Sequence, residues 1–210
     1  VPEGKGIPSF YKKYIETEGL YVTSSERVSD EALLKACDII SLMLAKRPDV
    51  KAHMVKRGCH VMVIGKDEET FGGAPEDELS SSCGEENLLA LPQDKYVGEN
   101  ILIHEFAHLI HTVGIVGVEP GFNDRLEALR QNAIRKGLWK DTYAVSNKEE
   151  YFAECVQSFF NCNRYADPAN GVHNWVNRRA KLKSYDPDMY RLLQEYFYEI
   201  EIPVNNIVHK

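Results

Sequence analysis

The hydrophobic and polar positions of this chain follow the period of amphipathic helices over most of its length. From Ser29 to Leu44 apolar residues recur at helical spacing, with Ser29 as a suitable N-cap and Pro48 as the end. A second pattern, Tyr96 to Val113, predicts a long central helix that closes near Gly114. Three more helices are predicted over residues 124–136, 146–161 and 186–200.

The last two of these helices begin at capping signals. Ser146-Asn147-Lys148-Glu149 has the form of a capping box, in which a hydroxyl and a carboxylate satisfy free backbone N–H groups. Asp186 precedes Pro187, and proline is favoured at the first position of a helix because it lacks an N–H group. We therefore expect Ser146 and Asp186 to be the N-caps.

Strand signals are fewer. Cys59 to Ile64 is rich in β-forming residues and predicts a strand, and residues 88–91 predict a second short one. Residues 66–86 are polar and predict a loop, in which 67–82 is either a flap over a cleft or a disordered excursion. Glu85 to Asn87 belong either to an edge strand that holds an extended substrate or to a plain loop. The balance predicts an α+β fold with a small sheet.

Composition and charge narrow the class of protein. The chain has 210 residues and a net charge of −7, which suits one globular domain and argues against nucleic-acid binding. The longest apolar run, Ile101 to Val118, is interrupted by charged and imidazole side chains, so we expect no membrane span. We expect a monomer.

The five cysteines and the start of the chain bear on its compartment. No CxxC pair occurs, so a cysteine zinc site is not expected. Cys37 and Cys155 lie in apolar helical patterns and predict core thiols, whereas Cys83 lies in the polar loop and is the better disulfide candidate. The chain begins with Val1, as a mature chain does after removal of a leader, and we expect a secreted protein.

The candidate chemistry lies in the central helix, as His104-Glu105-Phe106-Ala107-His108. Residues four apart project from one face of a helix, so the imidazoles of His104 and His108 can share a cation. The pattern HExxH is typical of zinc sites in which the glutamate, here Glu105, takes a proton from a zinc-bound water. The motif therefore predicts a zinc peptidase.

A catalytic zinc site needs a third protein ligand. The metzincin spacing is absent, because His111 and Gly114 stand in the reverse order. His111 is a rival ligand, but it lies two turns from His104, about 10 Å along the helix axis. A position at the surface, or behind the ligands in support of them, is favoured. Glu150, Glu154 and Gln157 form a polar stripe on an otherwise apolar helix, where one carboxylate can bind zinc and the other can hold a ligating histidine.

His-Glu-Phe-Ala-His together with the later Tyr-x6-Glu-x-Phe-Ala-Glu resembles the peptidase family of the anthrax lethal factor catalytic domain and the secreted proline–proline endopeptidases. The match covers about residues 96–160. It implies a gluzincin-type site in which His104, His108 and Glu150 bind one zinc ion. Glu105 is then the base, Glu154 is the carboxylate that holds a ligating histidine from behind, and the hydroxyl of Tyr143 stabilises the oxyanion.

The resemblance also implies a zincin-like domain with an active-site cleft between two lobes. Residues 1–95 would form the lobe with the small sheet, and residues 96–210 the helical part with the zinc site. The expected activity is endopeptidase cleavage of a protein or peptide. Two alternatives stay open at this point: a non-catalytic metal-binding or toxin-like recognition protein that keeps the fold, and a structural domain without a metal. Four other histidines have no partners by spacing, and most of them are expected at the surface: His53, His60, His173 and His209.

Overall fold

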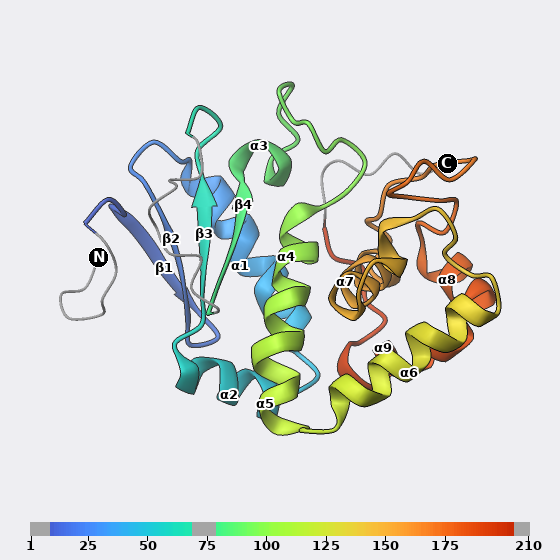
Figure 1. The fold of residues 1–210 in the computed structure, drawn as a ribbon. Helices are drawn as coiled ribbons and strands as arrows, with labels where there is room; N and C mark the ends of the chain where they lie inside the picture. The colour runs from blue at the N-terminus through green and yellow to red at the C-terminus, as the bar shows by residue number, and fades with distance from the viewer. Residues whose placement is uncertain (1–8, 69–78, 204–210) are drawn as a thin grey trace.

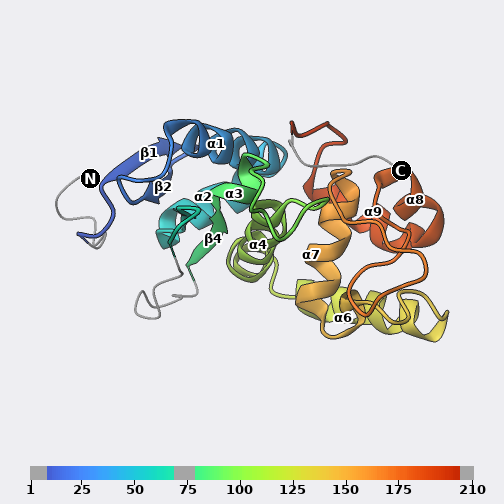
Figure 2. The same ribbon diagram turned by 90° about the horizontal axis from the view of Figure 1, so that it is seen from above.

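A computed structural model describes residues 9–68 and 79–203 of the chain. A four-stranded sheet with helices packed against it forms one side, and a group of helices forms the other (Figure 1). Helix α4 (Ile101–Leu109) runs between the two, and the view from above keeps it in that place (Figure 2). The predicted α+β class, helix-rich with a small sheet, is confirmed. A cleft between two lobes stays a prediction.

The sheet has the order β1-β2-β3-β4. Its strands are β1 (Lys13–Thr17), β2 (Leu20–Ser24), β3 (His60–Ile64) and β4 (Ser80–Gly84). Strand β1 is antiparallel to β2, while β3 is parallel to both β2 and β4. Glu18 and Gly19, with φ of 53° and 85°, join β1 to β2, as a two-residue hairpin turn with two positive φ angles requires. The prediction for residues 59–64 is confirmed, and the hairpin before it was not predicted.

Two helices connect β2 to the parallel strand β3. Helix α1 (Asp30–Leu44) begins as predicted, because the Ser29 hydroxyl accepts a hydrogen bond from the N–H of Ala32 at 3.3 Å. Pro48, predicted only to end this helix, is the first residue of α2 (Pro48–Arg57). Helix α1 covers the inner face of the sheet, where Val22, Val61 and Val63 are buried.

The predictions around the polar loop are partly wrong. Residues 88–91 are not a strand; the chain forms a short helix, α3 (Glu85–Leu88), and the strand is β4, directly before it. The serines of β4 give no β signal, and pairing with β3 creates the strand. Glu85 is buried, and its carboxylate accepts a hydrogen bond from the N–H of Ser29 at 2.8 Å, so it is not part of an edge strand. Most of the supposed flap, residues 69–78, lies outside the described residues.

The central helix continues beyond its predicted end. After α4 the chain forms a π-helix, η1 (Ile110–Ile115), and then one α-turn, α5 (Val116–Val118). Among the described residues only the run Ile101–Val118 is long and apolar enough to span a membrane, and 61% of it is buried inside the protein. That burial is typical of a core helix, so no clear membrane span is present.

The remaining helices form the second half of the fold. They are α6 (Phe122–Arg135), η2 (Tyr143–Val145), α7 (Lys148–Phe159), α8 (Arg179–Tyr185) and α9 (Pro187–Tyr196). Asp186 caps α9 as predicted, and its carboxylate accepts from the N–H of Met189. Helix α9 ends before residue 200, and α8 and η2 were not predicted. Helix α7 packs against α4, which brings the two halves of the predicted site together.

The cysteine prediction is correct for the core and wrong for the disulfide. Cys37 and Cys155 are buried as expected. Cys83 lies in β4 with its side chain turned into the core, and all five cysteines are buried free thiols. The prediction for Cys83 failed because β4 was interpreted as a polar loop.

Candidate metal centre and active site

His104 and His108 lie on the face of α4 that contacts α7, and Glu150 faces them from the first turn of α7. Helix α4 begins where the Asn100 side chain accepts a hydrogen bond from the N–H of Ile103 at 2.9 Å. The ligand atoms of the two histidines and Glu150 all lie within 4.8 Å of one another. Two segments 46 residues apart in sequence thus meet at one point.

The N-cap of α7 determines the direction in which the Glu150 side chain points. The side chain of Asn147 accepts a hydrogen bond from the N–H of Glu150 at 2.8 Å and is the N-cap. The predicted cap, Ser146, lies one residue earlier, and its hydroxyl donates instead to the carbonyl of Tyr143 at 2.7 Å. The capping signal was therefore correct to within one residue. Because α7 begins after Asn147, the side chain of Glu150 projects from the first turn of α7 toward α4.

The spacing of the three groups fits a metal ion. The Nε2 atoms of His104 and His108 are 3.1 Å apart, and Glu150 Oε2 lies 3.2 Å from the first and 3.4 Å from the second. Ligands at the usual zinc distances lie roughly 3.3 Å from one another in tetrahedral geometry. Two imidazoles and one carboxylate are also a donor set that zinc accepts. These three residues could therefore hold a metal ion.

The electrostatics of the group favour a positive charge at its centre. Burial alone would lower the pKa of His104, but the hydrogen bond to Glu150 and the charges of Glu154 and Glu105 outweigh it and raise that pKa to about 9. Burial would likewise raise the pKa of Glu150, yet the two imidazoles hold it at about 2. A proton on an imidazole or a bound metal cation would each supply the positive charge that this group favours. Only a metal cation can bond to His104, His108 and Glu150 at once.

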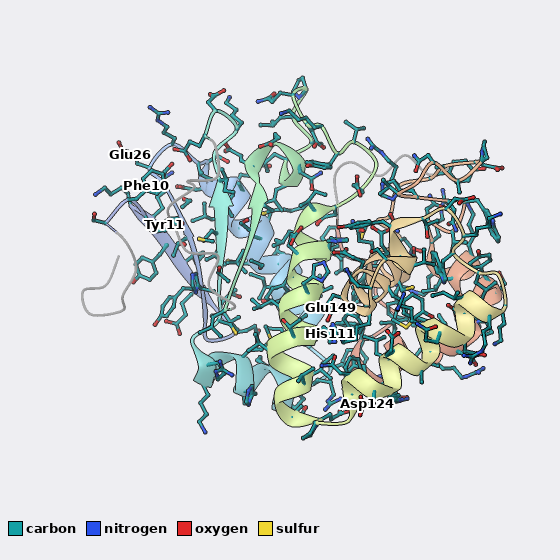
Figure 3. All side chains as sticks on the ribbon, viewed as in Figure 1. Phe10, Tyr11, Glu26, His111, Asp124 and Glu149 are labelled. Atoms are coloured by element: carbon teal, nitrogen blue, oxygen red, sulfur yellow. The ribbon has the colours of Figure 1, made fainter. Side chains whose placement is uncertain are left out.

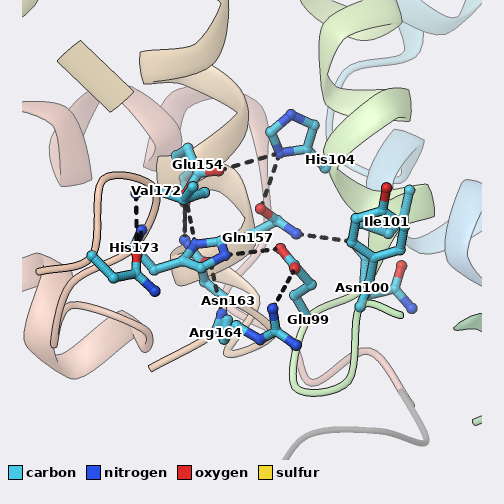
Figure 4. Close-up of polar contacts among 12 residues, drawn as sticks. Glu99, Asn100, Ile101, His104, Glu154, Gln157, Asn163, Arg164, Val172 and His173 are labelled. Carbon is cyan, nitrogen blue, oxygen red and sulfur yellow. Dashed lines mark hydrogen bonds and ion pairs between the residues drawn. The ribbon is translucent and has the colours of Figure 1, made fainter. Parts of the chain in front are cut away.

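Behind His104, two residues of α7 face its other ring nitrogen (Figure 4). Gln157 Oε1 lies 3.0 Å from His104 Nδ1, and Glu154 Oε1 lies 3.7 Å from it. The amide nitrogen of Gln157 donates to the carbonyl of Asn100 at 3.0 Å, which fixes the orientation of the amide. The amide oxygen therefore accepts from Nδ1–H and leaves His104 Nε2 to face His108.

This geometry refines the role expected of the polar stripe. The direct acceptor for His104 is Gln157, a residue that the sequence placed in the stripe without a role. Glu154 is near His104 at ion-pair distance only. The polar stripe on an apolar helix was the sequence feature that could have identified this role of Gln157. Gln157 is fully buried, and a buried amide requires hydrogen-bonding partners.

Glu105 and Tyr143 both lie near the three candidate ligands, because the charge of Glu105 acts on His104 and the charge of Glu150 acts on Tyr143. Glu105 is half-buried and makes no hydrogen bond or ion pair with any residue in the described part of the chain. Tyr143 is 44% exposed. The charge of Glu150, with smaller contributions from burial and from Glu105, raises the pKa of the Tyr143 phenol. Its hydroxyl therefore stays protonated at neutral pH and can donate a hydrogen bond.

His111, the rival ligand, is not part of the group. It is fully buried, and Figure 3 labels its position in the interior of the fold. Its ring packs against those of Phe122 and Phe152, which also contact each other, and its Nε2 lies 2.8 Å from Asn123 Oδ1. Burial lowers the pKa of this imidazole. His111 was expected either at the surface or behind the ligands, and the surface position is wrong. His111 lies in the π-helix, where hydrogen bonds reach one residue further than in an α-helix, so α-helical spacing from His108 does not apply.

His173 belongs to the four histidines of which most were expected at the surface, and it is buried. Its side chain is 5% exposed and lies between two buried carboxylates. Its Nε2 is 3.5 Å from Glu99 Oε2, and its Nδ1 is 3.6 Å from Glu154 Oε2. Burial opposes protonation, but the two carboxylates outweigh it and raise the pKa of His173 to about 9. No pattern in the sequence links the three residues, because they come from three separate segments.

Comparison with known proteins gives a structural likeness. No protein-family model matches the sequence, and no curated protein matches it. A solved structure, the PRO-PRO endopeptidase (PPEP-2) from Paenibacillus alvei, matches with a TM-score of 0.50 and 16% sequence identity. The match covers 87% of this chain and 100% of that chain. At this identity the likeness concerns the fold: this chain has an α+β fold similar to that of the endopeptidase.

Proposed function

We propose that this protein is a zinc-dependent endopeptidase that cleaves protein or peptide substrates and binds one zinc ion through His104, His108 and Glu150. The observation that carries the proposal is the convergence of these three ligand atoms at 3.1–3.4 Å from one another. The neighbouring Glu105 is a carboxylate without a hydrogen-bonding partner among the described residues. The fold shared with an endopeptidase supports the same conclusion.

Each member of the site then has a chemical role. When bound, zinc supplies a water molecule whose pKa is lowered to about 7. Glu105 accepts a proton from the attacking water and passes it to the amine that leaves. Gln157 holds His104 in the tautomer whose Nε2 is free for the ion.

Tyr143 would act on the substrate. As the scissile carbonyl is attacked, negative charge develops on its oxygen, and a hydrogen-bond donor aimed at that oxygen lowers the barrier. The raised pKa of the Tyr143 phenol keeps this donor protonated. Its exposed position on η2, beside the first turn of α7, leaves the hydroxyl accessible to a peptide.

An extended peptide could be held by β4. This strand is last in the order of the described sheet, and it packs against α4, the helix that carries both histidines. A peptide that pairs with the backbone of an edge strand is fixed along its length, while its side chains alternate in direction. Such binding would lay the substrate beside the metal group. Secretion and a monomeric state stay predictions from the sequence.

The first test is metal content together with cleavage. We expect about one equivalent of zinc per chain by mass spectrometry of the metal, because three ligands converge at one point. We also expect the zinc-loaded protein to cleave members of a broad peptide library. Zinc well below one equivalent, not restored by added ion, would contradict the proposal. Zinc binding without cleavage would favour the alternative, a metal-binding recognition protein that keeps the fold.

The second test is Glu105→Gln, which removes the base and keeps the size of the side chain. We expect cleavage to fall by about 10²–10⁴-fold, the usual contribution of a general base, with zinc content unchanged. Glu31→Gln, at an exposed carboxylate in the first turn of α1, is the control and should keep the parent rate. Cleavage by Glu105→Gln at the parent rate would show that another group is the base.

A further inference from the structure

A chain of buried charged groups extends from the metal centre into the second half of the fold. Glu154 Oε1 faces His104 Nδ1 at 3.7 Å, while Glu154 Oε2 faces His173 Nδ1 at 3.6 Å. On its other side, His173 Nε2 faces Glu99 Oε2 at 3.5 Å. The close-up shows these contacts as one continuous series (Figure 4). His173 is thus one carboxylate away from a proposed zinc ligand.

The partners of Glu154 determine how its carboxylate is turned. His173 and the amide of Asn163, which donates at 2.9 Å, both contact Oε2. The other oxygen, Oε1, is therefore left to face His104. A carboxylate held at one oxygen presents the second in a fixed direction. This is how outer residues commonly orient a metal-ligating imidazole.

Charge explains why the residue between the two carboxylates is a histidine. The side chains of Glu154 and Glu99 are 4% and 7% exposed. Two buried carboxylates are costly unless a cation lies between them. Arg164 reaches Glu99 at 3.8 Å, and no lysine or arginine among the described residues forms an ion pair with Glu154. His173 supplies a positive charge to both carboxylates, consistent with its raised pKa of about 9.

The loop that carries His173 is fixed by its own backbone contacts. The Asn170 side chain accepts from the N–H of His173 at 2.8 Å, and the N–H of Asn170 donates to the carbonyl of His173 at 3.1 Å. The adjacent carbonyl of Val172 accepts from the N–H of Tyr143 at 2.8 Å. The loop is therefore hydrogen-bonded to η2, and these backbone contacts keep the imidazole of His173 beside Glu154.

We propose that His173 is a positioning residue for the metal centre, which holds the Glu154 carboxylate so that its free oxygen supports His104. The inference rests on the proposed zinc site. It assigns a role to a histidine that lies outside the HExxH motif and outside the polar stripe of α7. It also explains why Glu154 is oriented although Gln157 is the direct acceptor for His104 Nδ1.

The test is the affinity for zinc, measured by competition with a chromogenic chelator and zinc alone as the probe. His173→Gln keeps a polar side chain and removes the charge. We expect zinc to bind about tenfold more weakly, at the lower end of the usual effect of outer partners. His60→Gln, at a half-buried histidine of β3 on the far side of α4, is the matched control and should bind as the parent does.

A double-mutant cycle separates positioning from general loss of structure. If His173 acts through Glu154, His173→Gln should weaken zinc binding in the parent and cause no further loss in a Glu154→Gln background. Losses that add in the double variant would overturn the inference, because His173 would then act without Glu154. An unchanged zinc affinity in His173→Gln would overturn it as well.

Glu99→Gln keeps the inference testable if His173→Gln does not fold. The carboxylate of Glu99 is linked to His104 through His173 and Glu154. Glu99→Gln should therefore also bind zinc more weakly in the parent and cause no further loss in the Glu154→Gln background. Parent affinity in Glu99→Gln would overturn the inference in that case. A parent chain that binds no zinc overturns the proposed function and this inference together, whereas zinc binding unaffected by these variants overturns the inference alone.

Discussion

At the scale of single residues, the candidate site depends on where two neighbouring glutamates of α7 point. Glu150 and Glu149 both lie in the first turn of the helix. Glu150 turns toward the histidines of α4, whereas Glu149 forms an ion pair with Lys148 at 2.8 Å. Two residues of the same type, in the same turn, thus have different surroundings. This pair offers a matched comparison for the third ligand.

Glu150→Gln should abolish stoichiometric zinc binding, because an amide oxygen carries no charge and two histidines alone leave the ion without its third protein ligand. Glu149→Gln should retain about one zinc per chain. Metal content after dialysis against zinc-free buffer measures both. If Glu150→Gln retained zinc, a residue other than Glu150 would have to be the third ligand. His111 would then have to leave its buried position beside Asn123 to serve.

At the scale of elements, the sequence predicted the features that depend on local spacing. It did not predict the features that depend on contacts between segments distant in the sequence. The HExxH helix, the caps at Ser29 and Asp186, and the polar stripe of α7 are local patterns, and the structure has them. Strand β4 has no β-forming side chains, and it exists because β3 lies beside it. His173 meets Glu154 only through tertiary packing.

The π-helix that follows α4, the helix with both histidines, is a further element that spacing could not predict. It lies against α2 at Gly114, where an added Cβ would stand 2.7 Å from Val50 Cγ1 and 3.0 Å from Met54 Sδ. No side chain fits there unless Val50 and Met54 shift. The glycine therefore allows η1 to approach α2 closely, and η1 is continuous with the helix that carries both histidines.

Gly114→Ala should lower the free energy of unfolding by about 1–3 kcal/mol, the usual cost of overpacking a core. Urea unfolding followed by circular dichroism measures the change. Val50→Ala removes the contacted methyl group, so the double variant Gly114→Ala/Val50→Ala should lose less stability than the sum of the two single losses. Strict additivity would mean that contact with α2 does not explain the glycine.

At the scale of the whole molecule, the proposed zinc ion would join parts of the chain that fold into different halves. His104 and His108 belong to the helix between the sheet and the second half, and Glu150 belongs to α7 (Figure 1). The three groups meet only in the folded chain. An ion that binds them binds the native state and not the unfolded chain, so binding adds directly to stability.

Zinc should therefore raise the temperature of unfolding, and a chelator should lower it. With free zinc at one hundred times its dissociation constant, the gain is about 2.7 kcal/mol. For a domain of this size that corresponds to a shift of about 5–10 °C. Differential scanning calorimetry with excess zinc and with chelator measures the shift, and Glu150→Gln is the control because it lacks the third ligand. Equal unfolding temperatures for the parent in both conditions would mean that zinc does not bind the folded chain at this site. A shift of the same size in Glu150→Gln would mean that zinc stabilises the protein through other groups, and the link between α4 and α7 would then rest on side-chain packing and on the hydrogen bonds of Gln157.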